Sequence, residues 1–159
     1  MPLDPDTFRS VLGRFATGVT IVTVRDGDGR DHGMTVNAFS SVSLVPPLVL
    51  VCIDRAASSH GPLLAASHFA VNILAAHQEA ISRRFSGVDE HHRFDGIGYS
   101  RGLTGAALLD DVLAHVECLR VAQHEAGDHT IVVGEVQTAV SFSERPLLYY
   151  RGGYAQLER

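Results

Sequence analysis

Residues 33–47, GMTVNAFSSVSLVPP, carry small hydroxyl and amide side chains between apolar residues and end at a double proline. Successive side chains of a β-strand point to opposite faces, so such a segment can keep some residues in a core while the others offer hydrogen bonds. No acidic residue lies between Gly33 and Val51. The segment therefore suits an anionic or electron-rich ligand.

The composition predicts one globular domain spanning residues 1–159. A chain of 159 residues with 45% hydrophobic content can bury one sizeable core and is short for two. Its formal net charge is −5, and all 13 basic residues are arginines. This balance argues against a broad nucleic-acid footprint.

The cysteines and the apolar segments indicate the compartment. Cys52 and Cys118 sit inside apolar runs without C-x-x-C spacing, so we expect reduced core residues rather than a disulfide. We find no signal-peptide pattern at the amino terminus, and no apolar run approaches membrane length. We therefore expect a cytoplasmic protein with neither a membrane nor a nucleic-acid partner.

The first quarter of the chain predicts a helix and a hairpin. Asp4-Pro5 provides a capping residue and a proline at the first helical position. Residues 19–24 are rich in β-branched side chains, and the turn signal DGDG at 26–29 leads to a second strand over residues 33–43. The predicted helix has an apolar stripe formed by Phe8, Val11, Leu12 and Phe15.

The middle of the chain predicts two more strands, a helix and a loop. Residues 48–53 are continuously apolar, as in a strand covered on both faces, and residues 69–74 resemble them. A helix is predicted over residues 75–86, stopped by Gly87. Residues 87–105 are rich in glycine, histidine and charge, so we expect a long mobile loop that would act as a lid if it lay near a ligand.

The last third predicts two long strands, residues 113–125 and 130–142, joined by a tight turn at 126–128. In the first strand the apolar phase moves between Cys118 and Leu119, which indicates a β-bulge. Many strands in hairpins with few helices favour a mainly β fold, an antiparallel closed barrel with a few flanking helices.

Several common site types are not indicated. The chain has no G-x-G-x-x-G opening a helix, no P-loop and no zinc signature. The pair His91-His92 is better explained by a solvated loop than by a metal site, and Ser40, Ser41 and Ser43 lack a G-x-S-x-G context.

Six segments, in order and at similar spacing, resemble the short-chain flavin reductase family, whose members share the Greek-key FMN-binding split barrel. The resemblance extends from Phe8 to Leu157. These segments are residues 15–23, 35–47, 52–54, 69–74, 127–130 and 149–154.

The resemblance implies an NAD(P)H-dependent flavin reductase. Its members reduce FMN, and in some cases FAD or riboflavin, with NADH or NADPH, and the reduced flavin diffuses to a separate flavin-dependent monooxygenase. They are homodimers, so a homodimer is expected here too. Two alternatives share the same barrel, a non-catalytic flavin- or heme-binding module and a pyridoxamine phosphate oxidase. The intact Gly127–Thr130 segment argues against the former, and the lack of a richly basic carboxyl-terminal segment argues against the latter.

The resemblance also implies which residues contact the flavin. Asn37 can donate and accept from one side chain, although it and Thr35 could instead satisfy neighbouring backbone. Ser41 and Ser43 match positions near the ribityl chain and phosphate, or could face solvent. The ring-binding strand is matched by Thr35, Val36, Asn37 and Ala38, and the next flavin-lining strand by Cys52, Ile53 and Asp54.

A phosphate needs positive charge or several hydroxyl and amide donors. Ser58 and Ser59, just before a predicted helix, can offer hydroxyls and the amides of that helix. Arg83, Arg84 and Phe85 match the family position where a basic residue reaches the phosphate and an aromatic residue follows. Of the two arginines we expect Arg84 to point inward, although the pair could simply complement the helix dipole.

The resemblance places His129 on the nicotinamide side of the flavin ring, where it could hydrogen-bond the carboxamide or steer the pyridine ring. Tyr154 and Arg151 match positions near the nicotinamide or ribose, although a tyrosine there could also be interface packing. Phe15 and Thr17 could line the same mouth, with core packing the favoured interpretation for Phe15.

Overall fold

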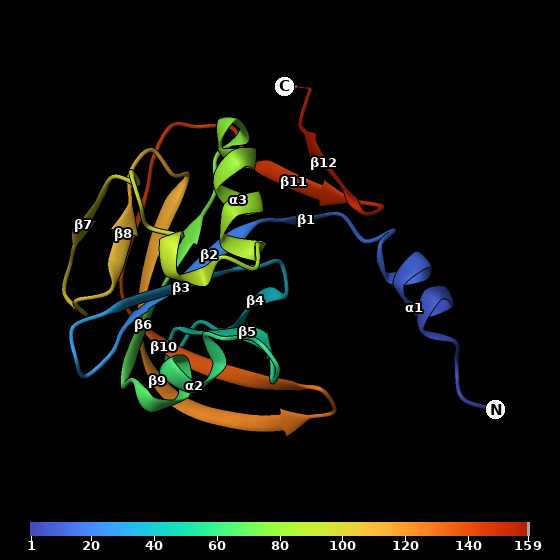
Figure 1. Cartoon of the computed structure of the whole chain (residues 1–159), viewed down its shortest axis with the longest axis horizontal. Helices are drawn as coiled ribbons and strands as arrows, with labels where there is room; N and C mark the ends of the chain where they lie inside the picture. Colours follow the sequence, from blue (N-terminus) through green and yellow to red (C-terminus); the bar gives the residue numbers. More distant parts are fainter. Residues whose placement is uncertain (159) are drawn as a thin grey trace.

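The structure is a computed structural model that describes residues 1–158, and it consists mainly of antiparallel β-strands (Figure 1). Seven strands form one sheet in the order β3-β2-β6-β9-β10-β5-β4. β1, β11 and β12 form a second sheet of three strands, and β7 pairs with β8. The predicted mainly β, antiparallel architecture with a few flanking helices is confirmed.

The helices are short, and none within residues 1–158 is long and apolar enough to cross a membrane. The helical elements are α1 (Pro5–Leu12), α2 (His60–Ala65), α3 (Glu79–Ser86) and the 3₁₀ turns η1 (Ala76–Gln78) and η2 (Glu90–His92). The strands are β1 (Thr17–Gly18), β2 (Thr20–Arg25), β3 (Asp31–Val36), β4 (Phe39–Ser43), β5 (Leu48–Asp54), β6 (His68–Ile73), β7 (Tyr99–Arg101), β8 (Ala107–Leu109), β9 (Ala114–Ala126), β10 (His129–Ser141), β11 (Leu147–Tyr150) and β12 (Gly153–Gln156).

β2 and β3 form the predicted hairpin, and its turn is held by the side chain of Asp26. The Asp26 carboxylate accepts hydrogen bonds from the backbone N–H groups of Asp28 and Arg30, both at 2.9 Å. It also lies 2.8 Å from Nε2 of His32. Gly29 has a φ of 81°, a left-handed conformation that glycine adopts without steric cost.

The chain joins the two edges of the large sheet at Asn37 and Ala38. β3 and β4 are consecutive in sequence, yet they are the opposite edge strands. At the crossing the Phe39 N–H donates to the Asn37 carbonyl and the Cys52 N–H donates to the Ala38 carbonyl, both at 3.0 Å. The prediction of one strand over residues 33–43 is therefore wrong, because its first half pairs with β2 and its second half with β5.

The β9–β10 hairpin is confirmed, with Gly127 at a φ of 64° in its turn. The register shifts twice, because β9 carries an extra residue at Val121 and β10 carries one at Gln137. The predicted bulge in the first strand is therefore present at Val121. The change of apolar phase at Cys118 lies beside the second bulge, on the partner strand.

β5 lies between β4 and β10 and is open on its outer face. Val49, Val51 and Ile53 are buried in the barrel, whereas Cys52 is half-buried and Asp54 is exposed. The prediction that this apolar run is covered on both faces is wrong. Its carboxyl-terminal end instead offers one free face beside the crossing.

The two larger of three buried apolar clusters within residues 1–158 hold the domain together. One fills the barrel and includes Val51, Ile53 and Phe69. The other lies beneath α3, which ends at Gly87 as predicted, and includes Phe85. Gly33 of β3 permits this packing, because a Cβ there would lie 2.7 Å from a ring carbon of Phe85.

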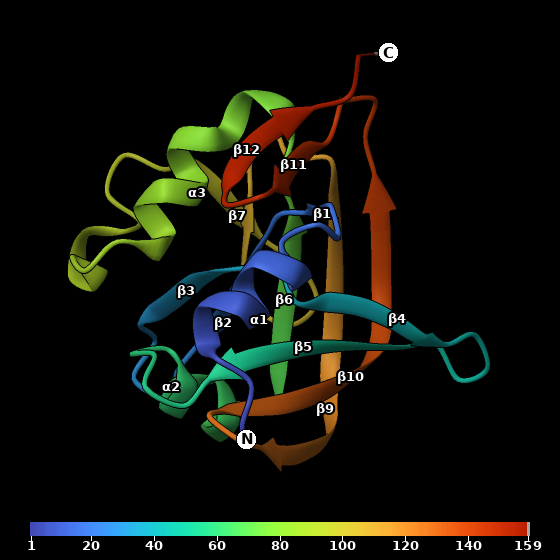
Figure 2. The ribbon, with the colours of Figure 1, turned by 90° about the vertical axis from the view of Figure 1, so that its right-hand side faces the viewer.

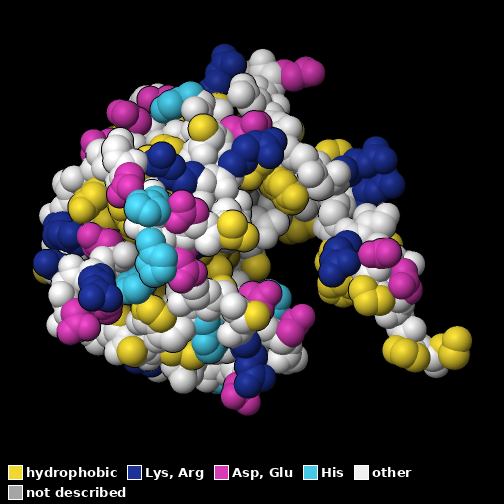
Figure 3. Space-filling model, in the orientation of Figure 1, with side chains coloured by type: hydrophobic (Ala, Val, Ile, Leu, Met, Phe, Trp, Pro, Cys, Tyr) yellow, Lys and Arg dark blue, Asp and Glu magenta, His cyan; other side chains and the backbone are white. Residues whose placement is uncertain are grey.

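α1 extends away from the barrel with the amino terminus (Figure 1), on the side that faces the viewer in Figure 2. Asp4 caps the helix as predicted, accepting from the Thr7 N–H at 3.0 Å. No residue of α1 is buried, and Phe15, just after the helix, is 76% exposed, so the expectation of core packing for Phe15 is wrong. Hydrophobic side chains lie uncovered on this arm in Figure 3.

Residues 87–105 are only partly irregular. They include η2 and β7, and β7 pairs with β8. Arg93, within this segment, is buried and hydrogen-bonded to the rest of the molecule. The expectation of a long loop is met in part, and its opening and closing over a ligand stays a prediction.

Candidate functional site

The crossing at Asn37 and Ala38 lies beside the open face of β5. The Ala38 carbonyl is bound by the Cys52 N–H, so the two expected flavin-lining segments are neighbours in space. Asn37 is exposed, and its side chain makes no hydrogen bond within residues 1–158. Its amide is therefore free to donate to and accept from a ligand, rather than satisfying neighbouring backbone.

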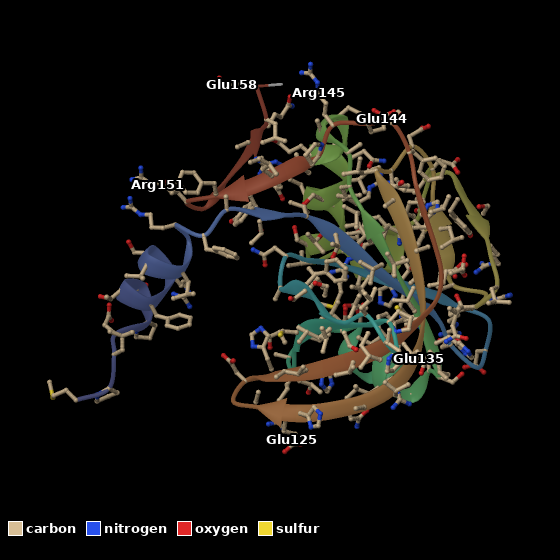
Figure 4. All side chains as sticks on the ribbon, turned by 180° about the vertical axis from the view of Figure 1, so that it is seen from behind. Glu125, Glu135, Glu144, Arg145, Arg151 and Glu158 are labelled. Carbon is tan, nitrogen blue, oxygen red and sulfur yellow. The ribbon has the colours of Figure 1, made fainter. Side chains whose placement is uncertain are left out.

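His129 stands at the same end of the barrel, because β10 pairs with β5 and places His129 opposite Asp54. The turn before it is fixed by Arg55, whose N–H donates to the Asp128 carbonyl at 2.9 Å and whose guanidinium reaches the Gly127 carbonyl at 3.4 Å. Figure 4 shows the end of this hairpin at Glu125. The structure thus brings His129 to the strand that contains Cys52 and Asp54.

The His129 ring has a defined orientation. Its Nδ1 lies 2.7 Å from the Asp128 carboxylate, and its side chain is 41% exposed. The hydrogen bond and the charge of His129 lower the pKa of Asp128. A carboxylate at Nδ1 accepts the proton on that nitrogen, so in the neutral ring Nε2 carries the lone pair and can accept a hydrogen bond.

A cavity of about 210 Å³ lies between β3, α3 and β12. Thr35 Oγ1 donates to the Ser82 carbonyl at 2.6 Å, and the Tyr154 hydroxyl lies 2.7 Å from Ser82 Oγ. The Arg83 guanidinium lies 4.9 Å from the centroid of the Tyr154 ring. The structure therefore places three of the expected residues, Thr35, Asn37 and Tyr154, around one cavity. The cavity is lined by Val19, Thr35, Asn37, Ser82, Ser86, Tyr149 and Tyr154.

Ser82 and Ser86 were missed from the sequence. They flank the arginine pair on α3 and lie one helical turn apart, so they share a face of the helix. That spacing is the only signal in the sequence, and it does not distinguish a ligand-facing serine from a solvated one. Thr35 already satisfies the Ser82 carbonyl, so its hydroxyl serves the fold at least in part.

The two arginines point differently from expectation. Arg84 donates to the carbonyl of Asp95 in the 87–105 segment. Arg83, in contrast, bonds to Glu79 at 3.1 Å and lies over Tyr154. Of the pair, Arg83 is the one beside the cavity, and the expectation for Arg84 is not supported by its orientation.

Ser58 and Ser59 line a second, larger cavity of about 450 Å³, together with residues of β3 and of the 87–105 segment. Ser59 is buried and its Oγ donates to the Gly33 carbonyl at 3.4 Å. The helix that follows has only six residues. Phe85 packs against Gly33 and Ser82 is bonded to Thr35, so α3 covers β3 between this cavity and the smaller one.

The remaining expected residues lie elsewhere. Ser41 and Ser43 are on edge strand β4, where Ser41 is exposed and Ser43 half-buried. Figure 4 shows Arg151 at the tip of the β11–β12 hairpin, next to α1, with its guanidinium directed outward. Its N–H donates to the Gly13 carbonyl at 2.9 Å. Val36, Ile53 and Phe85 have buried side chains, so only their backbones can take part in binding a ligand.

A family model described as "Flavin reductase like domain" matches residues 12–158. The chain belongs to this family. It is 42% identical to the FMN reductase (NADH) of Agrobacterium fabrum over 153 residues, covering 96% of this chain and 86% of that protein. It is 40% identical over 157 residues to the reductase subunit of a flavin-dependent monooxygenase from Rhodococcus jostii, covering 98% and 80%.

One similar solved structure contains bound ligands. The NADH:FAD oxidoreductase of Streptomyces globisporus, in complex with NAD and FAD fragments, has a TM-score of 0.90 and 39% identity to this chain, covering 99% of this chain and 96% of that one. The resemblance read from the sequence and the split-barrel fold are thereby confirmed for this flavin reductase-like chain.

The donor set of this family member fits a flavin. A flavin ring offers donors and acceptors on one edge, which Asn37 and the backbone of the crossing can match. Within the described residues no group of three or more histidine, cysteine or acidic side chains is placed to hold a metal ion. Burial raises the pKa of the Cys52 thiol, which favours its uncharged form on the open face of β5.

Proposed function

We propose that this chain is an NAD(P)H-dependent flavin reductase that reduces FMN, or FAD, by hydride transfer from a nicotinamide. The observation that carries the proposal is the meeting of three segments at one end of the barrel. These are the Asn37–Ala38 crossing, the open face of β5 at Cys52, and His129. Relatives with 40% identity or more act on flavins with NADH or serve as monooxygenase reductase subunits by name.

In this proposal the two cofactors supply the hydride chemistry and the protein supplies distance and orientation. Asn37 and the backbone near Ala38 hold the edge of the flavin ring. Cys52 and Asp54 border it on β5, with Ile53 and Val36 contributing backbone only. His129 accepts a hydrogen bond from the nicotinamide carboxamide through Nε2, and Tyr154 lines the adjoining cavity.

The phosphate end of the flavin points toward Ser58 and Ser59 in this proposal. This direction is supported by the larger cavity, which Ser58 and Ser59 line together with Gly33 of β3. Ser41 and Ser43 on β4 stay candidates for the ribityl chain. Arg84 stays a candidate only if it leaves the Asp95 carbonyl.

The chain works as a homodimer in this proposal. A monomer would leave the apolar residues of the α1 arm in water, and contiguous exposed apolar surface of this kind commonly marks an interface. Sedimentation at several concentrations should give the mass of a dimer, and a monomer throughout would contradict it. The exposed apolar residues of the α1 arm are Phe8, Val11, Leu12 and Phe15.

The reduced flavin passes by diffusion to a separate flavin-dependent monooxygenase. Support comes from relatives named as reductase subunits of such oxygenases.

A cytoplasmic location is supported by the free thiols of Cys52 and Cys118, because disulfides are rare in that compartment.

The competing function is a flavin- or heme-binding module without catalysis. NADH and NADPH oxidation by the purified chain, measured with and without added FMN or FAD, separates the two. Flavin-dependent oxidation of either nicotinamide is expected. Binding of flavin without any oxidation of NADH or NADPH would favour the module.

A further inference from the structure

Arg93 is a buried cation beside the larger cavity, in a segment that sequence reasoning assigned to a loop. The residue is 8% exposed and lines this cavity together with Ser58 and Ser59. Its Nη1 donates to the Gly33 carbonyl at 2.8 Å and its Nη2 to the Gly87 carbonyl at 2.6 Å. Its Nε has no hydrogen-bond partner within the described residues.

Within the described residues no carboxylate forms a direct ion pair with this guanidinium, and Glu90, which lines the same cavity, acts on it only from a longer distance. Asp31 lines the same cavity but is paired with Arg101, at 2.7 Å. Glu90 lies 3.8 Å from His91. A buried charge is costly unless it is paired and hydrogen-bonded, so an anion in direct contact with Arg93 would stabilise this arrangement.

The charge on Arg93 persists despite its burial. Burial lowers the pKa of the Arg93 guanidinium, and the nearby Glu90 carboxylate opposes that change. Arginine nevertheless stays protonated in proteins. The cavity therefore has a permanent buried cation in its wall in addition to the exposed Arg30, whereas its two histidines, His32 and His91, are charged only when protonated.

The side chains of Ser59 and Arg93 share one hydrogen-bond acceptor. Both donate to the carbonyl oxygen of Gly33, Ser59 Oγ at 3.4 Å and Arg93 Nη1 at 2.8 Å. The hydroxyl that the sequence marked as a phosphate donor is thus next to a cation that the sequence did not mark. A planar guanidinium with hydroxyls beside it is the donor set that binds phosphate.

We propose that Arg93, with Ser58 and Ser59, binds a phosphate group of the flavin nucleotide in the larger cavity. This inference rests on the proposed function. The shared chemistry is a phosphate ester, which could be the terminal phosphate of FMN or the adenylate phosphate of FAD.

The distance along β3 fits an elongated ligand. An extended chain rises about 3.3 Å per residue, so Gly33 and Asn37 are separated by at most about 13 Å along the strand. A flavin whose ring lies at Asn37 reaches the larger cavity only through its ribityl chain and phosphate. Arg30 also lines the larger cavity but is exposed, and Arg83 and Arg84 are exposed, already hydrogen-bonded and outside its lining.

The test compares riboflavin, FMN and FAD binding by the unmodified chain and by Arg93→Met. Losing a charge-assisted phosphate contact should weaken FMN or FAD about 10- to 100-fold relative to riboflavin, which has no phosphate. Arg93→Lys should retain part of the preference. Arg120→Met is the matched control, because Arg120 also donates to a carbonyl, that of Ala66 at 3.0 Å, but lines neither cavity.

The three flavins distinguish the two phosphates. A loss confined to FMN and FAD relative to riboflavin places the first phosphate at Arg93. A loss for FAD alone places the adenylate phosphate there. Equal weakening of all three flavins by Arg93→Met would mean that Arg93 only ties Gly33 to Gly87, and would overturn the inference.

A second variant covers the case in which Arg93→Met does not fold. Ser59→Ala keeps both carbonyl contacts of Arg93, and should lower the affinity for FMN or FAD relative to riboflavin by a few-fold. An unchanged ratio in both Ser59→Ala and Arg93→Lys would also overturn the inference, while leaving the proposed function intact. No flavin binding by the unmodified chain would contradict the proposed function and this inference together.

Discussion

Replacing His129 by alanine should weaken nicotinamide binding while leaving flavin affinity nearly unchanged. The structure gives the direction of the hydrogen bond that is lost. Asp128 holds Nδ1 at 2.7 Å, so Nε2 is left to accept from the carboxamide N–H of the nicotinamide. Because the side chain is 41% exposed, water competes for the same lone pair.

The magnitude follows from these two facts. A hydrogen bond between neutral groups that replaces bonds to water contributes about 0.5–1.5 kcal/mol net. This corresponds to about 2- to 12-fold in the dissociation constant for NADH or NADPH, whichever the chain uses. A poorly placed hydride donor should lower the rate of flavin reduction as well.

A thermodynamic cycle that combines the His129→Ala substitution with a change in the nicotinamide tests the assignment. Stopped-flow reduction of bound FMN is measured for the unmodified chain and His129→Ala with the preferred nicotinamide and with its acetylpyridine analogue, which has no amide N–H to donate. The variant should lose affinity for the natural nicotinamide and should bind the analogue as the unmodified chain does. Asp128→Asn, which changes the partner of Nδ1, serves as a control. Its affinity for the natural nicotinamide should lie between that of the unmodified chain and that of His129→Ala.

Two outcomes would refute this reasoning. If FMN affinity collapses while the nicotinamide dependence is unchanged, His129 belongs to the flavin pocket or to the fold. If both nicotinamides weaken equally, the ring acts by contact rather than through the proposed hydrogen bond.

Gly134→Ala should destabilise the fold by about 1–3 kcal/mol in chemical denaturation, because its Cβ would lie 2.6 Å from Phe69 Cζ and 2.7 Å from Cys118 Cβ; an unchanged free energy would mean that β10 shifts freely. Asp26 has a pKa lowered to about 2, chiefly by its hydrogen bond with His32, so it stabilises the folded state above its ordinary value of 3.8 and loses that effect as the pH falls toward 2. The difference in melting temperature between the unmodified chain and Asp26→Asn should therefore shrink over that range, and a constant difference would argue against the carboxylate. Burial, reinforced by Glu117, raises the pKa of the Cys118 thiol to about 12, so it should resist alkylation at neutral pH until the chain unfolds; rapid alkylation of the native chain would contradict this.

The sequence predicts local structure well where one residue decides it. The capping Asp4, the DGDG turn after β2 and the Gly127 turn between β9 and β10 all form as predicted, because turn and cap chemistry depends on near neighbours. The break at Asn37 was not predictable in this way. It depends on which strands pair with each half of residues 33–43, which periodicity does not reveal.

The candidate site was partly predictable for the same reason. The family motifs indicate Asn37, Cys52 and His129, which the fold brings to one end of the barrel. Which arginine faces a cavity depends on helix rotation and on distant carbonyls. Arg93 could not be recognised because nothing local in its charged, histidine-rich segment indicates burial.

Anaerobic mixing of the FMN-loaded chain with NADH, and in parallel with NADPH, tests the central claim most directly. The account predicts that the visible absorbance of the oxidised flavin is lost, one flavin for each nicotinamide oxidised, with at least one of the two donors. It also predicts that this loss slows when deuterium occupies the transferred position of the nicotinamide. FMN that binds at the barrel end but stays oxidised with both donors would contradict the account and leave a flavin-binding module.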